Sequence, residues 1–131
     1  MLHRNDQPLA GKSALVTGAS RRIGRAIALG LAQAGADVIV HARQSRAEVE
    51  AVAEEVRALG RRAEVALGDV TKEADVMAIF DAANQAFGGV DVLVNNAAIR
   101  GQKPFLDMTL EEWRATLSVI LDGAFLCSRE A

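Results

Sequence analysis

Short apolar runs and longer amphipathic stretches alternate along this chain. Apolar runs at residues 14–17, 38–40, 64–67 and 92–94 have the length and composition of buried strands. After the first run, Ile23, Ile27, Leu31 and Ala34 recur at helical spacing, which predicts a helix over residues 23–34. Strands that alternate with helices through short joins are typical of a parallel sheet covered by helices.

Local start and stop signals agree with this alternation. Ser45 and Glu48 have the spacing of a capping box and predict the start of a second helix, and Thr109 and Glu112 predict the start of the last one. A third helix is expected over residues 71–87, and the loop before the last helix holds Gly101 and Pro104. Glycines follow the expected ends of the first three helices: Gly35, Gly60, Gly88 and Gly89.

The last helix, over residues 109–131, carries a broad apolar stripe. The stripe consists of Trp113, Leu117, Ile120, Leu121, Ala124 and Phe125. The favoured interpretation is that this face packs on the sheet; the alternative is a helix–helix contact in a homo-oligomer.

Right-handed crossovers between four parallel strands give the spatial order 3-2-1-4. This is the first half of a Rossmann-type doubly wound sheet in a three-layer αβα arrangement, ending after the helix that follows the fourth strand. Without repeats or linkers, residues 1–131 form a single, partial domain of this type. The fourth strand is expected at an open edge, where it can pair with another chain.

Composition narrows the possible partners. The 131 residues carry a formal charge of −2 with acids and bases interspersed, which argues against nucleic acid. Cys127 is the single cysteine, so no internal disulfide can form. The start of the chain is polar and lacks the apolar core of a signal peptide. No apolar run approaches the roughly 18 residues that span a bilayer. Both features predict a cytoplasmic protein without membrane association.

The segment from Thr17 to Gly24 (TGASRRIG) lies between the first strand and the first helix. In this position Gly18 permits a sharp turn, and Gly24 permits close helix packing. Free N–H groups at the start of the helix, with the positive end of its dipole, favour an anion. A plain turn would also use glycine, but strand, helix and second strand together favour the pyrophosphate of a dinucleotide.

The end of the second strand favours NADP over NAD. In dinucleotide-binding sheets an acid at this place bonds the ribose 2′-hydroxyl of NAD. Here Asp37 lies at the start of the strand, whereas Arg43 follows its end and can attract a 2′-phosphate, with Arg21 adding to it. The alternative is that Arg43 is an ordinary solvated side chain.

The chain resembles the short-chain dehydrogenase/reductase family in three motifs. These are the Thr17 to Gly24 turn, the sequence Gly-Asp-Val-Thr at residues 68–71, and Asn-Asn-Ala-Ala at residues 95–98. The resemblance covers about residues 9–131 and the first half of a family member. It implies that Asp69 bonds the adenine amino group beside Val70, and that Asn96 and Ala97 line the cofactor. Asp69 as a helix cap and Asn95 as a tie between neighbouring strands are the structural alternatives.

Three positions depart from the usual family pattern. Arg22 replaces the middle glycine of the turn, where it either crowds the pyrophosphate or, as in members similar to pteridine reductases, adds a phosphate contact. Ala98 replaces the final glycine of the third motif, and Ile120 occupies the place of an active-site asparagine.

The resemblance implies hydride transfer between NADP(H) and a carbonyl or alcohol substrate. The 131 residues contain no tyrosine, and no lysine matches the family's Tyr-x-x-x-Lys motif, so no turnover is expected of this chain alone.

The alternative function is a non-catalytic dinucleotide-binding or interaction module. A third possibility, a flavodoxin-like phosphate sensor, is not supported, because no cluster of acidic residues is expected at the carboxyl edge of the sheet. The candidate cofactor-binding residues are Gly18, Ser20, Arg21, Arg22, Ile23, Gly24, Arg43, Asp69, Val70, Asn96 and Ala97.

Overall fold

A single parallel sheet forms the centre of the molecule. The computed structural model describes residues 6–99 and 103–131, so His3 and Gly101 lie outside the described residues. The strands run in the spatial order β3-β2-β1-β4, and every neighbouring pair is parallel, which confirms the predicted topology. Their bounds are β1 Ser13–Val16, β2 Asp37–Ala42, β3 Ala63–Leu67 and β4 Val92–Val94.

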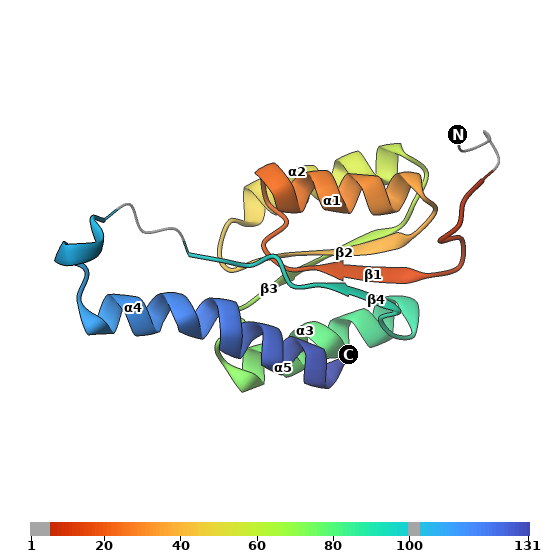
Figure 1. Ribbon diagram of the computed structural model, residues 1–131. Coiled ribbons are helices and arrows are strands. Elements are labelled where there is room, and N and C mark those ends of the chain that lie inside the picture. Colours follow the sequence, from red (N-terminus) through yellow and green to blue (C-terminus); the bar gives the residue numbers. More distant parts are fainter. Residues whose placement is uncertain (1–5, 100–102) are drawn as a thin grey trace.

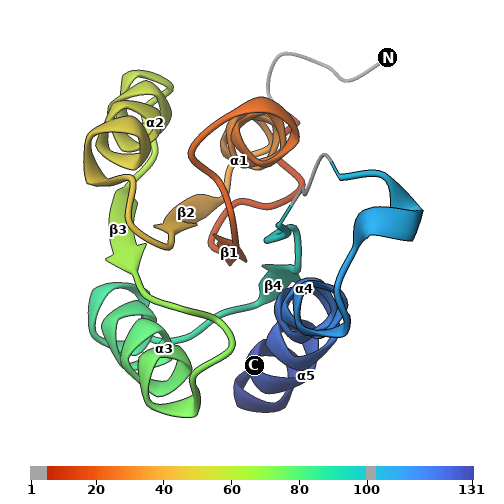
Figure 2. The ribbon, with the colours of Figure 1, turned by 90° about the vertical axis from the view of Figure 1, so that its left-hand side faces the viewer.

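Helices cover both faces of the sheet and complete the three layers (Figures 1 and 2). One face carries α1 (Arg22–Gln33) and α2 (Arg46–Ala58), and the other carries α3 (Glu73–Phe87) with the helical segments that end the chain. These last segments are α4 (Leu110–Leu117), the π-helical turn η2 (Ser118–Asp122) and α5 (Gly123–Glu130), preceded by the 3-10 turn η1 (Phe105–Asp107).

The core is divided by the sheet into two apolar clusters. Val16, Val38 and Val40 face α1 and α2, whereas their strand neighbours Leu15 and Ile39 face α3 and α5. Successive side chains of a strand point to opposite faces, so strands buried on both sides need continuous apolar runs. This is why the short strands were recognisable from the sequence.

Only one of the two predicted capping boxes makes its side-chain cap. The Thr109 hydroxyl accepts from the Glu112 amide at 3.1 Å and caps α4. Ser45 is the N-cap residue of α2, which confirms the predicted start of this helix, but its side chain makes no capping bond. The Glu48 carboxylate instead lies 3.5 Å from the Arg21 guanidinium of the β1–α1 turn.

The predicted packing of the apolar stripe on the sheet is also wrong. Trp113, Leu121 and Phe125 are 46%, 58% and 60% exposed, whereas Gly123 and Cys127 are buried. A Cβ on Gly123 would lie 2.7 Å from Val70 Cγ2, so the helix approaches the β3–α3 loop through its smallest residues. The π-helical turn, with its i to i+5 bonds, also interrupts the regular spacing that the single-helix prediction assumed.

β4 lies at one edge of the sheet as predicted, with its three residues half-buried. Figure 1 shows α4 extending past the carboxyl ends of the strands. Among the described residues, none of the helices has the length and apolar character needed to cross a bilayer.

Candidate functional site

A cavity of about 910 Å³ opens at the carboxyl edge of the sheet. It is bounded by the β1–α1 turn, the end of β2, the β3–α3 loop, the segment after β4, and one side of α4 and η2. The carboxyl ends of parallel strands meet at one edge, where doubly wound sheets bind their ligands. All the candidate residues named from the sequence line this cavity: Gly18, Ser20, Arg21, Arg22, Ile23, Gly24, Arg43, Asp69, Val70, Asn96 and Ala97.

The β1–α1 turn is built on two close approaches that only glycine permits. Gly18 has φ +62°, and a Cβ there would lie 2.9 Å from Ala97 Cα. A Cβ on Gly24 would lie 2.1 Å from the Gly18 carbonyl oxygen and 2.6 Å from Asn96 Nδ2. The start of α1 therefore packs directly on the turn, which leaves the space beyond the helix start open to a ligand.

Arg22 occupies the middle-glycine position and keeps a left-handed backbone, with φ +51°. A non-glycine residue in this region is uncommon and is strained by about 1–3 kcal/mol when it is held there by its surroundings. The Arg22 side chain is exposed and lines the cavity, so the turn retains its glycine-type shape and gains a cation beside the helix start.

The turn presents consecutive backbone donors to the cavity. Within the described part of the chain, no acceptor pairs with the amide N–H groups of residues 20–24, whereas Ala19 donates to the His41 carbonyl at 2.7 Å. These donors lie at the positive end of the α1 dipole, and a phosphate satisfies such groups. The turn therefore has the properties of an anion-binding site.

Thr17 and Asn96 connect the end of β4 to the turn. The Thr17 hydroxyl accepts from the amides of Asn96 at 3.0 Å and Ala97 at 2.9 Å, and Asn96 Nδ2 donates to the Gly18 carbonyl at 3.0 Å. Asn95 was predicted to connect neighbouring strands, but this connection is made by Asn96. The Asn95 side chain instead donates to the Ser128 hydroxyl of α5 at 3.1 Å.

Two arginines at the far side of the cavity are held by carboxylates. Arg43 Nε lies 3.8 Å from Asp69 Oδ2, and Arg21 lies 3.5 Å from Glu48, with both arginine side chains more than half exposed. Exposed pairs of this kind contribute about 0–1 kcal/mol, so both guanidinium groups can turn to an anionic ligand. Asp37 is at the opposite end of β2, as predicted from its place at the start of the strand. There its carboxylate accepts from the Arg62 guanidinium.

Asp69 shapes the β3–α3 loop without capping α3. One carboxylate oxygen accepts from the Thr71 hydroxyl at 2.7 Å and from the Thr71 amide at 2.9 Å, and the helix begins two residues later, at Glu73. The bonds from Thr71 and the charge of Arg43 hold the pKa of Asp69 below its usual value. The helix-cap alternative is therefore wrong, and an ionised acceptor lines the cavity.

His41 is not among the residues predicted from the sequence, although it lies between the β1–α1 turn and the end of β3 and is 2% exposed. Its Nδ1 accepts from the Gly18 amide at 3.0 Å, and its Nε2 lies 2.8 Å from the Gly68 carbonyl oxygen. A polar residue that ends an otherwise apolar buried strand was the available signal.

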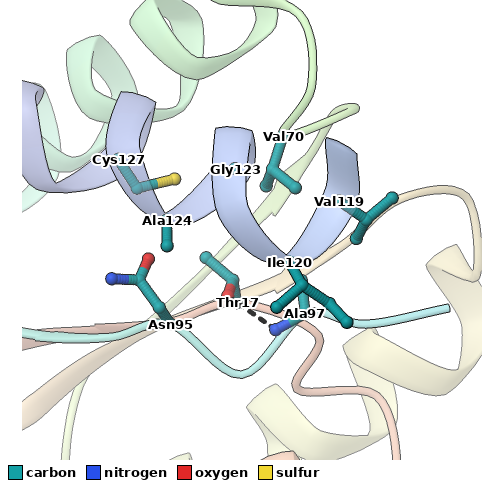
Figure 3. A pocket seen from close by; sticks show the side chains of 9 residues that line it. All are labelled: Thr17, Val70, Asn95, Ala97, Val119, Ile120, Gly123, Ala124 and Cys127. Carbon is teal, nitrogen blue, oxygen red and sulfur yellow. Dashed lines mark hydrogen bonds between the residues drawn. The ribbon is translucent and has the colours of Figure 1, made fainter. Parts of the chain in front are cut away.

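A second, smaller cavity of about 10 Å³ lies just past the carboxyl ends of β1 and β4, beside η2 and α5 (Figure 3). Ile120, at the place of the family's asparagine, lines it together with Thr17 and Asn95. Cys127 lines it too, and burial raises the pKa of its thiol, which keeps it protonated and a poor nucleophile. Its size is near that of one water molecule.

The fold and the cavity of about 910 Å³ at the sheet edge define the class: the first half of a Rossmann-type doubly wound sheet. The family model for short chain dehydrogenases matches residues 12–131, and the chain belongs to this family.

Relatives and solved structures agree with this assignment. The chain is 43% identical to the NADPH-dependent aldehyde reductase-like protein, chloroplastic, of Arabidopsis thaliana, over 95% of this chain and 50% of that protein. It is 44% identical to a short-chain type dehydrogenase/reductase of Picea abies, over 94% and 48%. The crystal structure of a short chain dehydrogenase from Burkholderia cenocepacia in complex with NADP superposes with a TM-score of 0.88 at 43% identity, over 94% and 50%. The chain therefore spans about half the length of the relatives it matches.

Proposed function

We propose that this chain is the cofactor-binding half of an oxidoreductase that transfers hydride between NADP(H) and a carbonyl or alcohol substrate. The observation that carries the proposal is the set of amides at residues 20–24, which have no acceptor among residues 6–99 and 103–131 and face a cavity lined also by Arg21 and Arg43. The nucleotide, when bound, would donate hydride to a carbonyl in its reduced form and accept hydride from an alcohol in its oxidised form. The amides would hold its pyrophosphate, and the two arginines its 2′-phosphate.

The remaining candidate residues would hold the adenosine and nicotinamide ends of the nucleotide. Asp69 carries an ionised carboxylate that can accept from the adenine amino group, with Val70 beside it. Asn96 already donates its side-chain amide to Gly18, so its part is to shape the turn, and Ala97 offers a small surface near the ribose. The family relationship and the NADP complex of the Burkholderia protein support this arrangement.

The proposal is tested by calorimetric titration of the purified 131-residue chain with NADPH and with NADH at one fixed salt concentration. We expect NADPH to bind with a micromolar Kd, about tenfold or more tighter than NADH. The same samples should show no NADPH oxidation with aldehyde or ketone substrates, because the sequence contains no tyrosine to act as the proton donor. Failure of both nucleotides to bind would refute the proposed function, and measurable reductase activity would refute the expected lack of turnover.

A second candidate function, an interaction module, is favoured by the exposed apolar residues Trp113, Leu121 and Phe125 on α4, η2 and α5. We propose that this face, or the open edge of β4, forms a homo-oligomer contact. Sedimentation velocity should then show a dimer, and Phe125→Glu should convert it to a monomer where the apolar face makes the contact but leave it a dimer where the β4 edge does. A monomer at all concentrations would exclude this function.

A further inference from the structure

We propose that His41 is a positioning residue of the cofactor site: its neutral imidazole holds the β1–α1 turn in its anion-binding shape, and its protonated form cannot. The inference rests on the proposed cofactor function. It gives NADP(H) binding by this chain a pH dependence that originates in the protein.

The hydrogen-bond partners of the ring determine its protonation state. The Gly18 amide is a donor, so Nδ1, 3.0 Å away, must be an unprotonated acceptor. The Gly68 carbonyl is an acceptor, so Nε2, 2.8 Å away, must carry the hydrogen. The arrangement therefore requires the neutral tautomer protonated at Nε2. A second proton would place two N–H groups against each other at Nδ1.

His41 links three strand ends in this way. Through Nδ1 it binds the turn after β1, through Nε2 it binds the end of β3, and its own carbonyl accepts from Ala19. Protonation removes the ring's bond to Gly18 but leaves the backbone bond to Ala19. The Gly18 amide then faces an N–H group in place of its acceptor, while the Gly18 carbonyl keeps its bond from Asn96 at 3.0 Å. The Gly18 amide turns away from the ring, and the donors of residues 20–24, which follow Gly18 along the chain, lose their common direction.

The charged surroundings have opposing effects on the imidazolium. Burial disfavours the protonated ring most strongly and lowers the pKa of His41, whereas the bond to the Gly68 carbonyl and the charge of Asp69 favour the protonated ring. Asp75 of α3 accepts from the amide of Asp69, the neighbour of Gly68, at 2.8 Å. β1 has no titratable side chain, and the pairs Arg21–Glu48 and Arg25–Glu55 join the turn and α1 to α2. Cations line the same cavity and oppose protonation: Arg21, Arg22 and Arg43.

The test compares NADPH affinity between pH 8 and pH 5 in the wild-type chain and in His41→Asn. Asparagine offers an uncharged acceptor near the position of Nδ1 and does not titrate. Below the pKa of His41 the wild-type affinity should fall by up to about tenfold per pH unit, the limit for one linked proton. The His41→Asn affinity should lack this component. The 2′-phosphate changes charge near pH 6 in both titrations, so the ratio of the two affinities isolates His41.

His3→Asn is the matched control, since His3 is the other histidine of the sequence, and it should keep the wild-type profile. Circular dichroism at each pH identifies samples that remain folded. Parallel profiles for the wild type and His41→Asn would overturn the proposal.

A second measurement needs neither cofactor nor variant. In ¹⁵N spectra of the wild-type chain at pH 7.5, we expect Nδ1 to be unprotonated and Nε2 protonated, and the Gly18 amide signal to titrate together with the ring. A protonated Nδ1 at pH 7.5, or a Gly18 amide signal that does not shift as the ring titrates, would overturn the positioning role. Absence of NADPH binding at every pH, with this coupling intact, would instead refute the proposed function.

Discussion

Arg43→Ala is expected to weaken NADPH binding by about 10- to 150-fold and to leave NADH binding within about twofold. A charge-assisted hydrogen bond contributes about 1.5–3 kcal/mol, and each 1.4 kcal/mol corresponds to a factor of about ten in Kd. NADH lacks the 2′-phosphate, so the substitution removes no hydrogen bond to NADH. Because Arg43 contacts Asp69 at 3.8 Å and its side chain is 63% exposed, its guanidinium is available to the ligand.

Arg46→Ala is the matched control for this measurement. Arg46 is similarly exposed and lies three positions further along the chain, but it pairs with Glu50 at 3.5 Å and does not line the cavity. Calorimetry at constant ionic strength should find its Kd for NADPH within about twofold of wild type, because distant exposed charges are largely screened. Equal losses of NADPH and NADH affinity in Arg43→Ala would show that Arg43 does not select the 2′-phosphate.

Gly24→Ala is expected to destabilise the fold by about 3 kcal/mol or more and to abolish measurable NADPH binding. The added Cβ would meet the Gly18 carbonyl oxygen at 2.1 Å and Asn96 Nδ2 at 2.6 Å. Either α1 moves away from the turn or the bond between Asn96 and Gly18 breaks. Both responses displace the donors of residues 20–24. Urea unfolding followed by circular dichroism measures the stability, and calorimetry measures the binding.

The same helix offers a control with the opposite sign. Gly30 is exposed, and a Cβ there would meet nothing within 4 Å. Gly30→Ala should therefore stabilise the chain by up to about 1 kcal/mol, the difference in helix propensity, without changing NADPH affinity. A Gly24→Ala protein with wild-type stability and binding would contradict the close packing of α1 on the turn.

Much of the candidate site could be predicted from the sequence because its parts lie at predictable places on a simple topology. Residues that follow the apolar runs come to one edge of a parallel sheet, which is why Gly18, Arg43, Asp69 and Asn96 line one cavity. Their part in binding a cofactor remains a prediction for the titrations above.

The misjudged residues are those whose partners come from elsewhere in the fold. Glu48 leaves its local cap for Arg21, 27 positions away, and Asn95 binds Ser128 of α5. The last helix packs through Gly123 because its smallest residues permit the closest approach to the β3–α3 loop. A stripe of large apolar side chains is a sound guide to burial only when a surface of matching shape is opposite it.

The sequence by itself determined the strands, their order in the sheet and the edge at which the candidate site lies, because these follow from periodicity, glycine positions and the handedness of crossovers. Only the tertiary structure decided which side chains share a hydrogen bond across that edge. His41 shows the difference: it binds Gly18, 23 positions away, and Gly68, 27 positions away. Hydrogen bonds act over about 3 Å, and only the folded chain brings such distant groups within that range.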